Sequence, residues 1–161
     1  MKKTSAGLLL GMLIALPLAA AEPAADEKAA QGQSAAGFRD DLQSIETEVI
    51  SKAVSLTTDE ATKFWPVFKQ FQAEQKATID AQLAAVRNYA NNYATLTDAQ
   101  AMEYVNALLE RDQSIHDLRV KYLAEFSKIL PAGKAARVIH TSRRVGIAAQ
   151  AKLASEIPLV H

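Results

Sequence analysis

The side chains that most often do chemistry in proteins are few in this 161-residue chain, and they are widely spaced. There is no cysteine, and the only histidines are His116, His140 and His161. The sequence contains neither a Gly-x-Ser-x-Gly elbow nor a glycine-rich phosphate loop. Because these motifs position nucleophiles and phosphates, their absence predicts no catalytic residue and no nucleotide site. We therefore expect a protein that is not an enzyme and takes no cofactor.

One pair of residues has the spacing of metal ligands. Asp112 and His116 are four positions apart, so they share a face if this segment is helical. A carboxylate and an imidazole are both ligands of Zn²⁺. If two helices pair about a turn at 94–97, Gln75 lies opposite His116, and the three side chains form a polar layer that sets the helix register. We favour that structural role, or plain exposure of these side chains, and keep metal binding as the alternative.

A second group of side chains could contact another protein. Phe64, Phe68 and Phe71 are spaced by four and three residues, which is typical of a helix face packed into a core. Trp65 is rotated by about 100° from Phe64 on the same helix. It is therefore covered by another helix, or lies at a dimer contact, or is offered to a partner as an exposed apolar residue.

Charge is distributed unevenly along the chain. Residues 22–60 contain nine acidic and three basic residues, whereas residues 127–155 contain six basic residues and no acidic one. The simpler interpretation is that the first and last helices attract each other or are solvated; the other is a basic surface for a partner. Together with the aromatic group, the basic stretch gives our candidate partner-binding residues, which are Phe64, Trp65, Phe68, Arg137, Arg143 and Arg144.

Two short matching segments mark the starts of long helices. Each reads Leu-Thr-x-x-(Glu/Gln), and a threonine followed three residues later by Glu or Gln forms a capping box, which satisfies two backbone N–H groups at a helix start. Each segment is followed by a long amphipathic run. The capping residues of the two segments are Leu56, Thr57 and Glu60 in the first, and Leu96, Thr97 and Gln100 in the second.

These signals predict an all-α fold without strands. We expect helices at about 38–55, 57–93, 97–130 and 132–155. The two central helices are joined by only a few residues, so they form a long antiparallel hairpin against which the shorter helices pack, within one copy or in a cradle-like dimer. Pro66 lies inside the second helix and predicts a bend between Thr62 and Pro66.

The N-terminus reads as a secretory signal peptide at residues 1–21. Lys2 and Lys3 precede an apolar run at 7–18, and small residues follow at 19–21. Residues 22–37 lack large apolar side chains and predict a flexible linker. The helical domain then covers 38–155, and 156–161 form a tail. Without the signal, 16 basic and 18 acidic residues leave a net charge of −2, which predicts neither nucleic-acid binding nor membrane insertion.

An exported, cysteine-free, helical chain with two Leu-Thr-x-x-(Gln/Glu) helix starts resembles the Spy/CpxP-like family of periplasmic proteins, also called the LTxxQ-motif family. The resemblance covers 38–155; the segment at 96–100 matches the motif fully, while Glu60 stands where the motif has Gln. The resemblance implies a helical hairpin, often a cradle-shaped dimer. It also implies ATP-independent chaperones, repressors of envelope-stress sensors, or metal-responsive proteins. This chain departs from the family in its slightly acidic charge and in having no His-rich segment.

We therefore expect a periplasmic, non-enzymatic protein that binds unfolded or stress-related envelope proteins, or a sensor protein, in a Gram-negative-type envelope. A homodimer is expected, since few large apolar residues are available to complete a core within one copy. One alternative is a metal-responsive sensor that uses Asp112 and His116. Another is a structural helical adaptor with one dedicated partner.

Overall fold

The computed structural model describes the backbone of residues 24–160 and the side-chain environment of residues 37–160. Four long helices account for nearly all of this part, and no strand occurs in it: α1 (Ala24–Ala53), α2 (Thr58–Asn92), α3 (Asp98–Ile129) and α4 (Ala132–Glu156). A short 3-10 turn, η1 (Tyr93–Thr95), links α2 to α3. The predicted all-α fold is confirmed. The predicted signal peptide, residues 22–23 and His161 lie outside the described residues.

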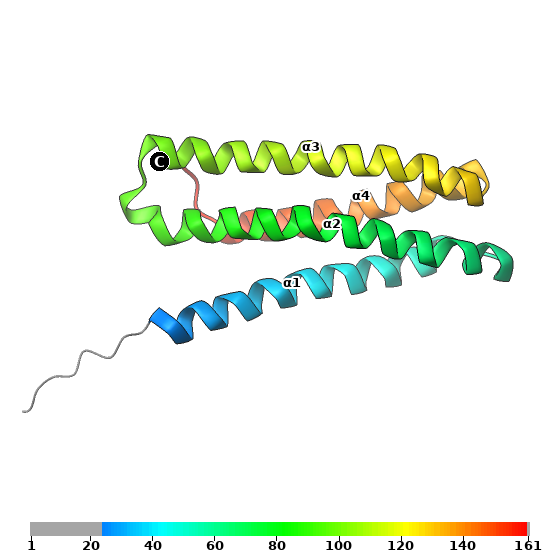
Figure 1. Ribbon diagram of the computed structural model, residues 1–161, viewed down its shortest axis with the longest axis horizontal. Coiled ribbons are helices and arrows are strands. Elements are labelled where there is room, and N and C mark those ends of the chain that lie inside the picture. Colours follow the sequence, from blue (N-terminus) through cyan, green and yellow to red (C-terminus); the bar gives the residue numbers. More distant parts are fainter. Residues whose placement is uncertain (1–23, 161) are drawn as a thin grey trace, which may run out of the picture.

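The helices form an elongated bundle (Figure 1). α2 and α3 run antiparallel along their length, as the short connection predicts, and make the most extensive helix pair. α4 returns beside them, and α1 packs on α4 and α2. α2 continues as one helix through Pro66. None of the described helices is long and apolar enough to cross a membrane.

Both predicted capping boxes are present. The Thr57 hydroxyl accepts a hydrogen bond from the Glu60 N–H at 3.3 Å, and the Thr57 N–H donates to the Glu60 carboxylate at 2.7 Å. Thr97 and Gln100 make the same reciprocal pair at 3.3 and 3.0 Å. These bonds satisfy backbone donors that have no partner within the helix, so the helices begin where the sequence predicts.

Glu60 has a second role that explains why a carboxylate can serve at this position. Its side chain also accepts from the Lys134 ammonium of α4 at 2.6 Å. The hydrogen bond from Lys134 contributes most to lowering the pKa of Glu60, and the hydrogen bond from the Thr57 N–H contributes next. A glutamine would preserve the cap but would lose this ion pair, so Glu60 ties the start of α2 to the start of α4.

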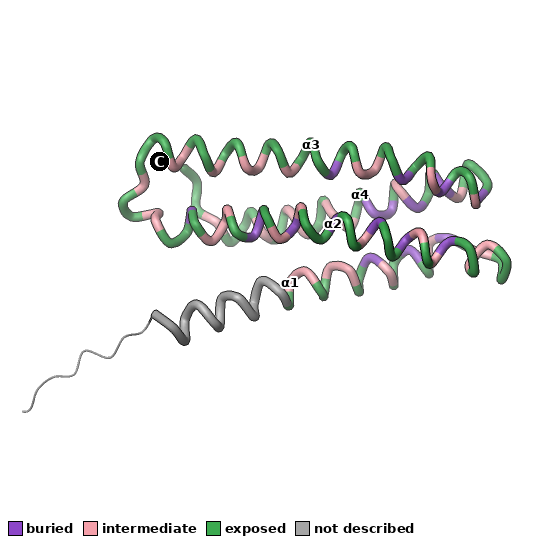
Figure 2. The backbone as a smooth tube through the Cα atoms, in the orientation of Figure 1, coloured by how far each residue is buried: buried purple, intermediate pink, exposed green. Residues whose placement is uncertain are grey.

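The hydrophobic core is concentrated at one end of the bundle. Figure 2 shows the buried backbone gathered toward the end where α1 turns into α2 and α3 turns into α4. The core there consists of aromatic rings from α2 and α3 with aliphatic side chains from α1, from α4 and from the positions directly after α1 and α3: Ile50, Val54, Phe64, Phe68, Phe71, Tyr122, Phe126, Leu130, Ala135 and Val138.

The other half of the bundle combines buried apolar residues, such as Ile79 and Leu83, with polar contacts between helices. Gln82 of α2 and Gln150 of α4 exchange amide hydrogen bonds at 2.7 and 3.2 Å. At the α2–α3 tip, the Tyr89 and Tyr104 rings stack with centroids 4.1 Å apart. The Tyr89 hydroxyl donates to the Pro158 carbonyl at 3.1 Å, which fastens the tail after α4 to the hairpin tip.

The structure corrects one predicted boundary. α1 begins at Ala24, so the backbone from there to residue 37 is helical and not the flexible linker that we expected. The prediction relied on the absence of large apolar residues. Alanine, glutamine and glutamate are strong helix formers, and a helix already nucleated by the packed residues after 37 can extend through them without burying a core face.

Candidate functional site

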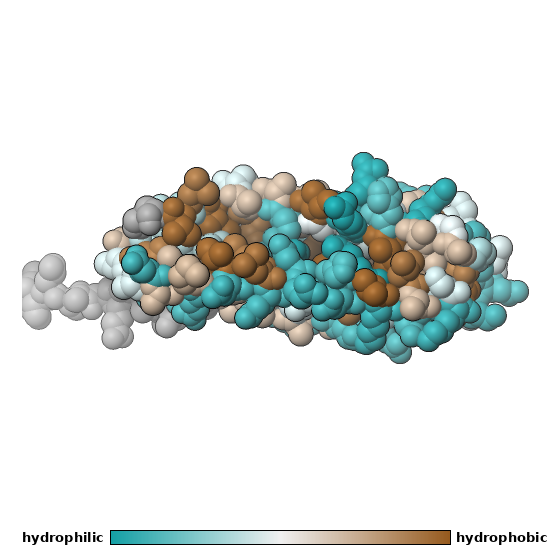
Figure 3. Space-filling view, turned by 90° about the horizontal axis from the view of Figure 1, so that it is seen from above, coloured by the Kyte–Doolittle hydropathy of each residue, from teal (hydrophilic) through white to brown (hydrophobic). Residues whose placement is uncertain are grey.

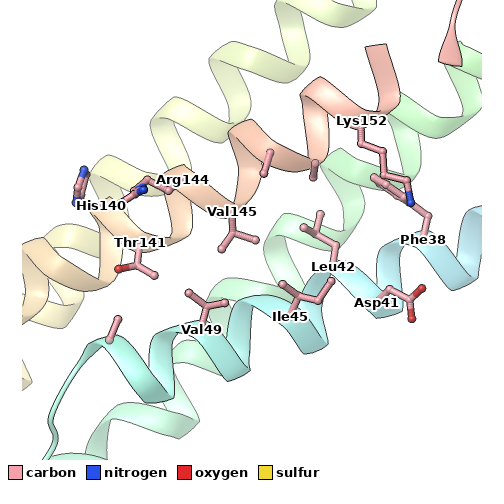
Figure 4. A pocket seen from close by; sticks show the side chains of 13 residues that line it. Phe38, Asp41, Leu42, Ile45, Val49, His140, Thr141, Arg144, Val145 and Lys152 are labelled. Carbon is pink, nitrogen blue, oxygen red and sulfur yellow. The ribbon is translucent and has the colours of Figure 1, made fainter. Parts of the chain in front are cut away.

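A largely apolar groove runs between α1 and α4 (Figure 4). Its volume of about 740 Å³ is within the range of small-ligand and peptide sites. One wall comes from α1 and the other from α4. The lining residues are Phe38, Asp41, Leu42, Ile45, Val49, Ala53, His140, Thr141, Arg144, Val145, Ala148, Ala149 and Lys152.

The α1 wall is built by apolar residues at helical spacing. Leu42, Ile45 and Val49 follow one another at three and four residues, so they share a face, and Figure 4 shows them pointing toward Val145 of α4. Ile45 is 51% exposed and Val49 37% exposed, although both line the groove. On the α4 wall the small side chains of Ala148 and Ala149 leave the space open.

The rim of the groove is charged mainly on the α4 side. Arg144 and Lys152 lie there together with His140, and Asp41 is the acidic residue on the α1 side. Among the described residues, neither Arg144 nor Lys152 forms an ion pair. A groove with an apolar floor and cations along one rim fits an apolar polypeptide segment that carries carboxylates at its edge.

Behind the groove, a buried carboxylate joins α1 to its neighbours. Glu46 is only 2% exposed. Its carboxylate accepts a hydrogen bond at 3.4 Å from the amide of Gln72, which also donates to the Gln43 carbonyl at 2.9 Å. The hydroxyl of Ser142 on α4 faces the same carboxylate. Among the described residues, however, the Ser142 hydroxyl has no partner at hydrogen-bonding distance and angle.

Burial dominates the electrostatics of Glu46. Desolvation raises its pKa, and the hydrogen-bonding groups together with the charge of Arg119 on α3 offset this only in part. The same burial lowers the pKa of the Arg119 guanidinium. Glu46 therefore places a buried carboxyl group where α1 meets α2, α3 and α4.

The aromatic residues predicted to contact a partner belong to the core instead. Phe64 and Phe68 are 0% and 1% exposed, and their ring centroids lie 5.3 and 6.4 Å from that of Phe126. Because these rings are enclosed between α2 and α3, they cannot offer a surface to a partner, and that part of the prediction is wrong.

Trp65 lies between core and surface. Its ring meets Phe64 edge-on at 5.0 Å and Phe68 at 5.8 Å, and the side chain is half-buried. Its outer side lines a shallow depression at the start of α2, beside Thr62 and Pro66. This depression shares no residue with the α1–α4 groove.

The three candidate arginines are all exposed on α4, but they do not form one site. Arg144 lines the groove. Arg137 lies at the end of the bundle, where its guanidinium donates to the Ala53 carbonyl at 3.4 Å. Arg143 is exposed and does not line the groove. Only Arg144 therefore stands where the predicted charged contact with a partner would meet an apolar surface.

The candidate metal ligands do not come together with Gln75. Asp112 and His116 are exposed on α3, and Asp112 pairs with Arg111 at 2.7 Å, whereas Gln75 is buried on α2. The predicted polar layer is wrong and the alternative of plain exposure holds, because the buried residue of this segment is Ile115, which lies between Asp112 and His116 in the sequence. Within the described residues, no group of three or more His, Asp or Glu side chains could hold a metal ion.

The α1 wall has a signal in the sequence, because Phe38, Leu42, Ile45 and Val49 follow one another at four, three and four residues, the spacing of one apolar helix face. Nothing in the sequence showed that α4 would meet this face with small side chains. Comparisons with known proteins do not add to this assignment: no family model matches the chain, and no curated protein or solved structure is significantly similar to it.

Proposed function

We propose that this chain is a non-enzymatic protein-binding protein of the bacterial periplasm that holds apolar segments of unfolding proteins in the α1–α4 groove without ATP. The observation that supports this most is the groove itself, an open apolar channel whose rim carries Arg144 and Lys152, neither of which is in an ion pair with another described residue. The resemblance to the Spy/CpxP-like family, whose members include such holding chaperones, points the same way.

Binding in this groove has a simple physical basis. Apolar side chains of an unfolded segment are removed from water against Leu42, Ile45 and Val145, at about 25 cal/mol per Å² of buried apolar area. Arg144 and Lys152 attract carboxylates that flank the segment and raise the rate of encounter. No step requires nucleotide hydrolysis, because an open surface binds and releases its client by affinity alone.

The test is suppression of aggregation. A protein unfolded by reduction or heat is mixed with the purified chain in the absence of ATP, and light scattering is followed. We expect suppression at near-stoichiometric ratios, and loss of most of it in Ile45→Ser and in Arg144→Glu. Both side chains are exposed, so these variants should keep the parent fold by circular dichroism.

Matched controls lie outside the groove. Leu159→Ser removes an apolar side chain that is even more exposed than Ile45, 87% against 51%, and Lys63→Glu reverses an exposed charge on α2. Both should hold the client as the parent does. Equal loss in groove and control variants would show that holding is not localised, and no suppression by the parent, together with a single stoichiometric partner in a pull-down, would favour a dedicated adaptor.

A further inference from the structure

A second apolar surface lies on the outer side of α3, away from α2. Met102, Val105 and Leu109 are spaced by three and four residues, and Val120 and Leu123 continue the same side of the helix further along. We call these five residues the α3 stripe. Met102 is 60% and Leu109 61% exposed, so this face has no covering element in the described chain. Figure 3, which looks onto the molecule from the α3 side, shows apolar patches separated by hydrophilic side chains.

Acidic residues follow the α3 stripe at a regular interval. Seven residues, or about two helical turns, separate Glu103 from Glu110 and Glu110 from Asp117, so all three lie on one flank of the helix. All three are exposed. None forms an ion pair among the described residues; the only hydrogen bond from a side chain to them comes from the Gln113 amide to Asp117 at 2.8 Å.

The charge of this part of α3 has one sign. Residues 98–118 contain five acidic residues and one basic residue, and that basic residue, Arg111, is paired with Asp112. Such a face repels acidic segments and anionic lipid headgroups, and it attracts cations. The α1–α4 groove has the opposite character, with cations on its rim. The two surfaces therefore select different partners.

We propose that the α3 stripe docks an amphipathic helix whose apolar side is flanked by lysine or arginine. Two helices pack through side chains repeating at three and four residues, which is the spacing within each of the two parts of the α3 stripe, 102–109 and 120–123. Charges that flank such a seam choose the partner more than they add affinity, so Glu103, Glu110 and Asp117 select basic flanks. This proposal is independent of client holding in the groove.

The test uses two synthetic peptides of about 20 residues, which as helices are about 30 Å long. They share one leucine stripe; one has lysine and arginine flanks and the other has glutamate flanks. Fluorescence anisotropy with the full chain should show binding of the basic peptide, weakening as salt is added, and much weaker binding of the acidic peptide. The double variant Glu103→Lys/Glu110→Lys should bind the basic peptide with an affinity about tenfold lower or more.

The controls separate this surface from the rest of the molecule. Met102→Ser/Leu109→Ser should abolish binding while circular dichroism stays unchanged, because both side chains are exposed. Glu48→Lys/Glu156→Lys makes the same change of net charge away from α3 and from the groove, and should bind like the parent. Failure of the basic peptide to bind, or equal binding of both peptides, would overturn the proposal. So would a chain that is dimeric by light scattering and becomes monomeric in Met102→Ser/Leu109→Ser, because a second copy would then occupy the α3 stripe.

Discussion

Replacing Phe126 by alanine should remove the contact that joins α3 to the aromatic rings of α2. Phe126 is fully buried, and its ring centroid lies 5.3 Å from that of Phe64, 6.2 Å from Phe71 and 5.7 Å from Tyr122. Truncation of such a ring loses the transfer free energy of the buried atoms and leaves a cavity that the helices fill only in part. We expect the free energy of unfolding to fall by about 3–5 kcal/mol.

This loss is large compared with the whole. Domains of this size are stable by about 5–15 kcal/mol, so Phe126→Ala removes about a fifth of that or more. With a shift of about 2–4 °C per kcal/mol at this chain length, the melting temperature should fall by roughly 6–20 °C. Phe126→Leu keeps most of the volume and should cost only about 1–2 kcal/mol.

Urea unfolding measured by far-ultraviolet circular dichroism and by tryptophan fluorescence gives this number. Trp65 is the only tryptophan, and it touches the edge of the cluster, 5.0 Å from Phe64, so its emission reports the same packing. Leu123→Ala, at a partly exposed position on the same helix, is the control and should cost less than about 1 kcal/mol. A loss below about 1 kcal/mol for Phe126→Ala would refute our assignment of the aromatic group to the core.

Three further predictions concern single positions. Burial raises the pKa of Glu46, so this side chain keeps its proton to higher pH in the folded state than in the unfolded state. The stability of the parent therefore falls as pH rises through the raised pKa. Thermal melts from acid to neutral pH should show Glu46→Gln becoming more stable relative to the parent as pH rises. Thr97→Ala removes one side of a capping box and should cost about 1 kcal/mol in urea unfolding, whereas Thr95→Ala in the preceding turn should cost almost nothing. Gly146→Ala places a Cβ 2.9 Å from the end of the Arg119 side chain. Because that end can move and alanine favours a helix interior, we expect a stabilisation of no more than about 1 kcal/mol, seen as a higher melting temperature. A lower melting temperature would mean that the Arg119 side chain is held in place.

The helix boundaries could be predicted because they depend on local chemistry. The capping pairs at Thr57 and Thr97 join residues three apart, and Pro131 stops α3 by removing a backbone donor. The antiparallel α2–α3 pairing followed from the short link between them. The helical start of α1 was missed because low hydrophobicity was given more weight than helix propensity.

The candidate site could be predicted only in part. The sequence indicated an apolar face on the first helix and cations on the last, but it could not show that these two elements line one groove. That juxtaposition is non-local, because Ile45 and Arg144 are about a hundred residues apart and meet only through the packing of α1 on α4. Phe64 and Phe68 were predicted as binding residues because the sequence does not show which neighbouring helix covers their face of α2.

The sequence by itself determined the elements: four helices, two reciprocal caps, and apolar stripes at helical spacing. Each of these follows from contacts within a few residues, which a linear chain specifies directly. Tertiary structure alone decided which stripe became core and which stayed open. It also decided that Glu46 is buried where α1 meets its neighbours and that Glu60 meets Lys134 seventy-four residues away. These outcomes depend on how whole helices pack, because exposure and ion pairing are properties of neighbours that the sequence does not place side by side.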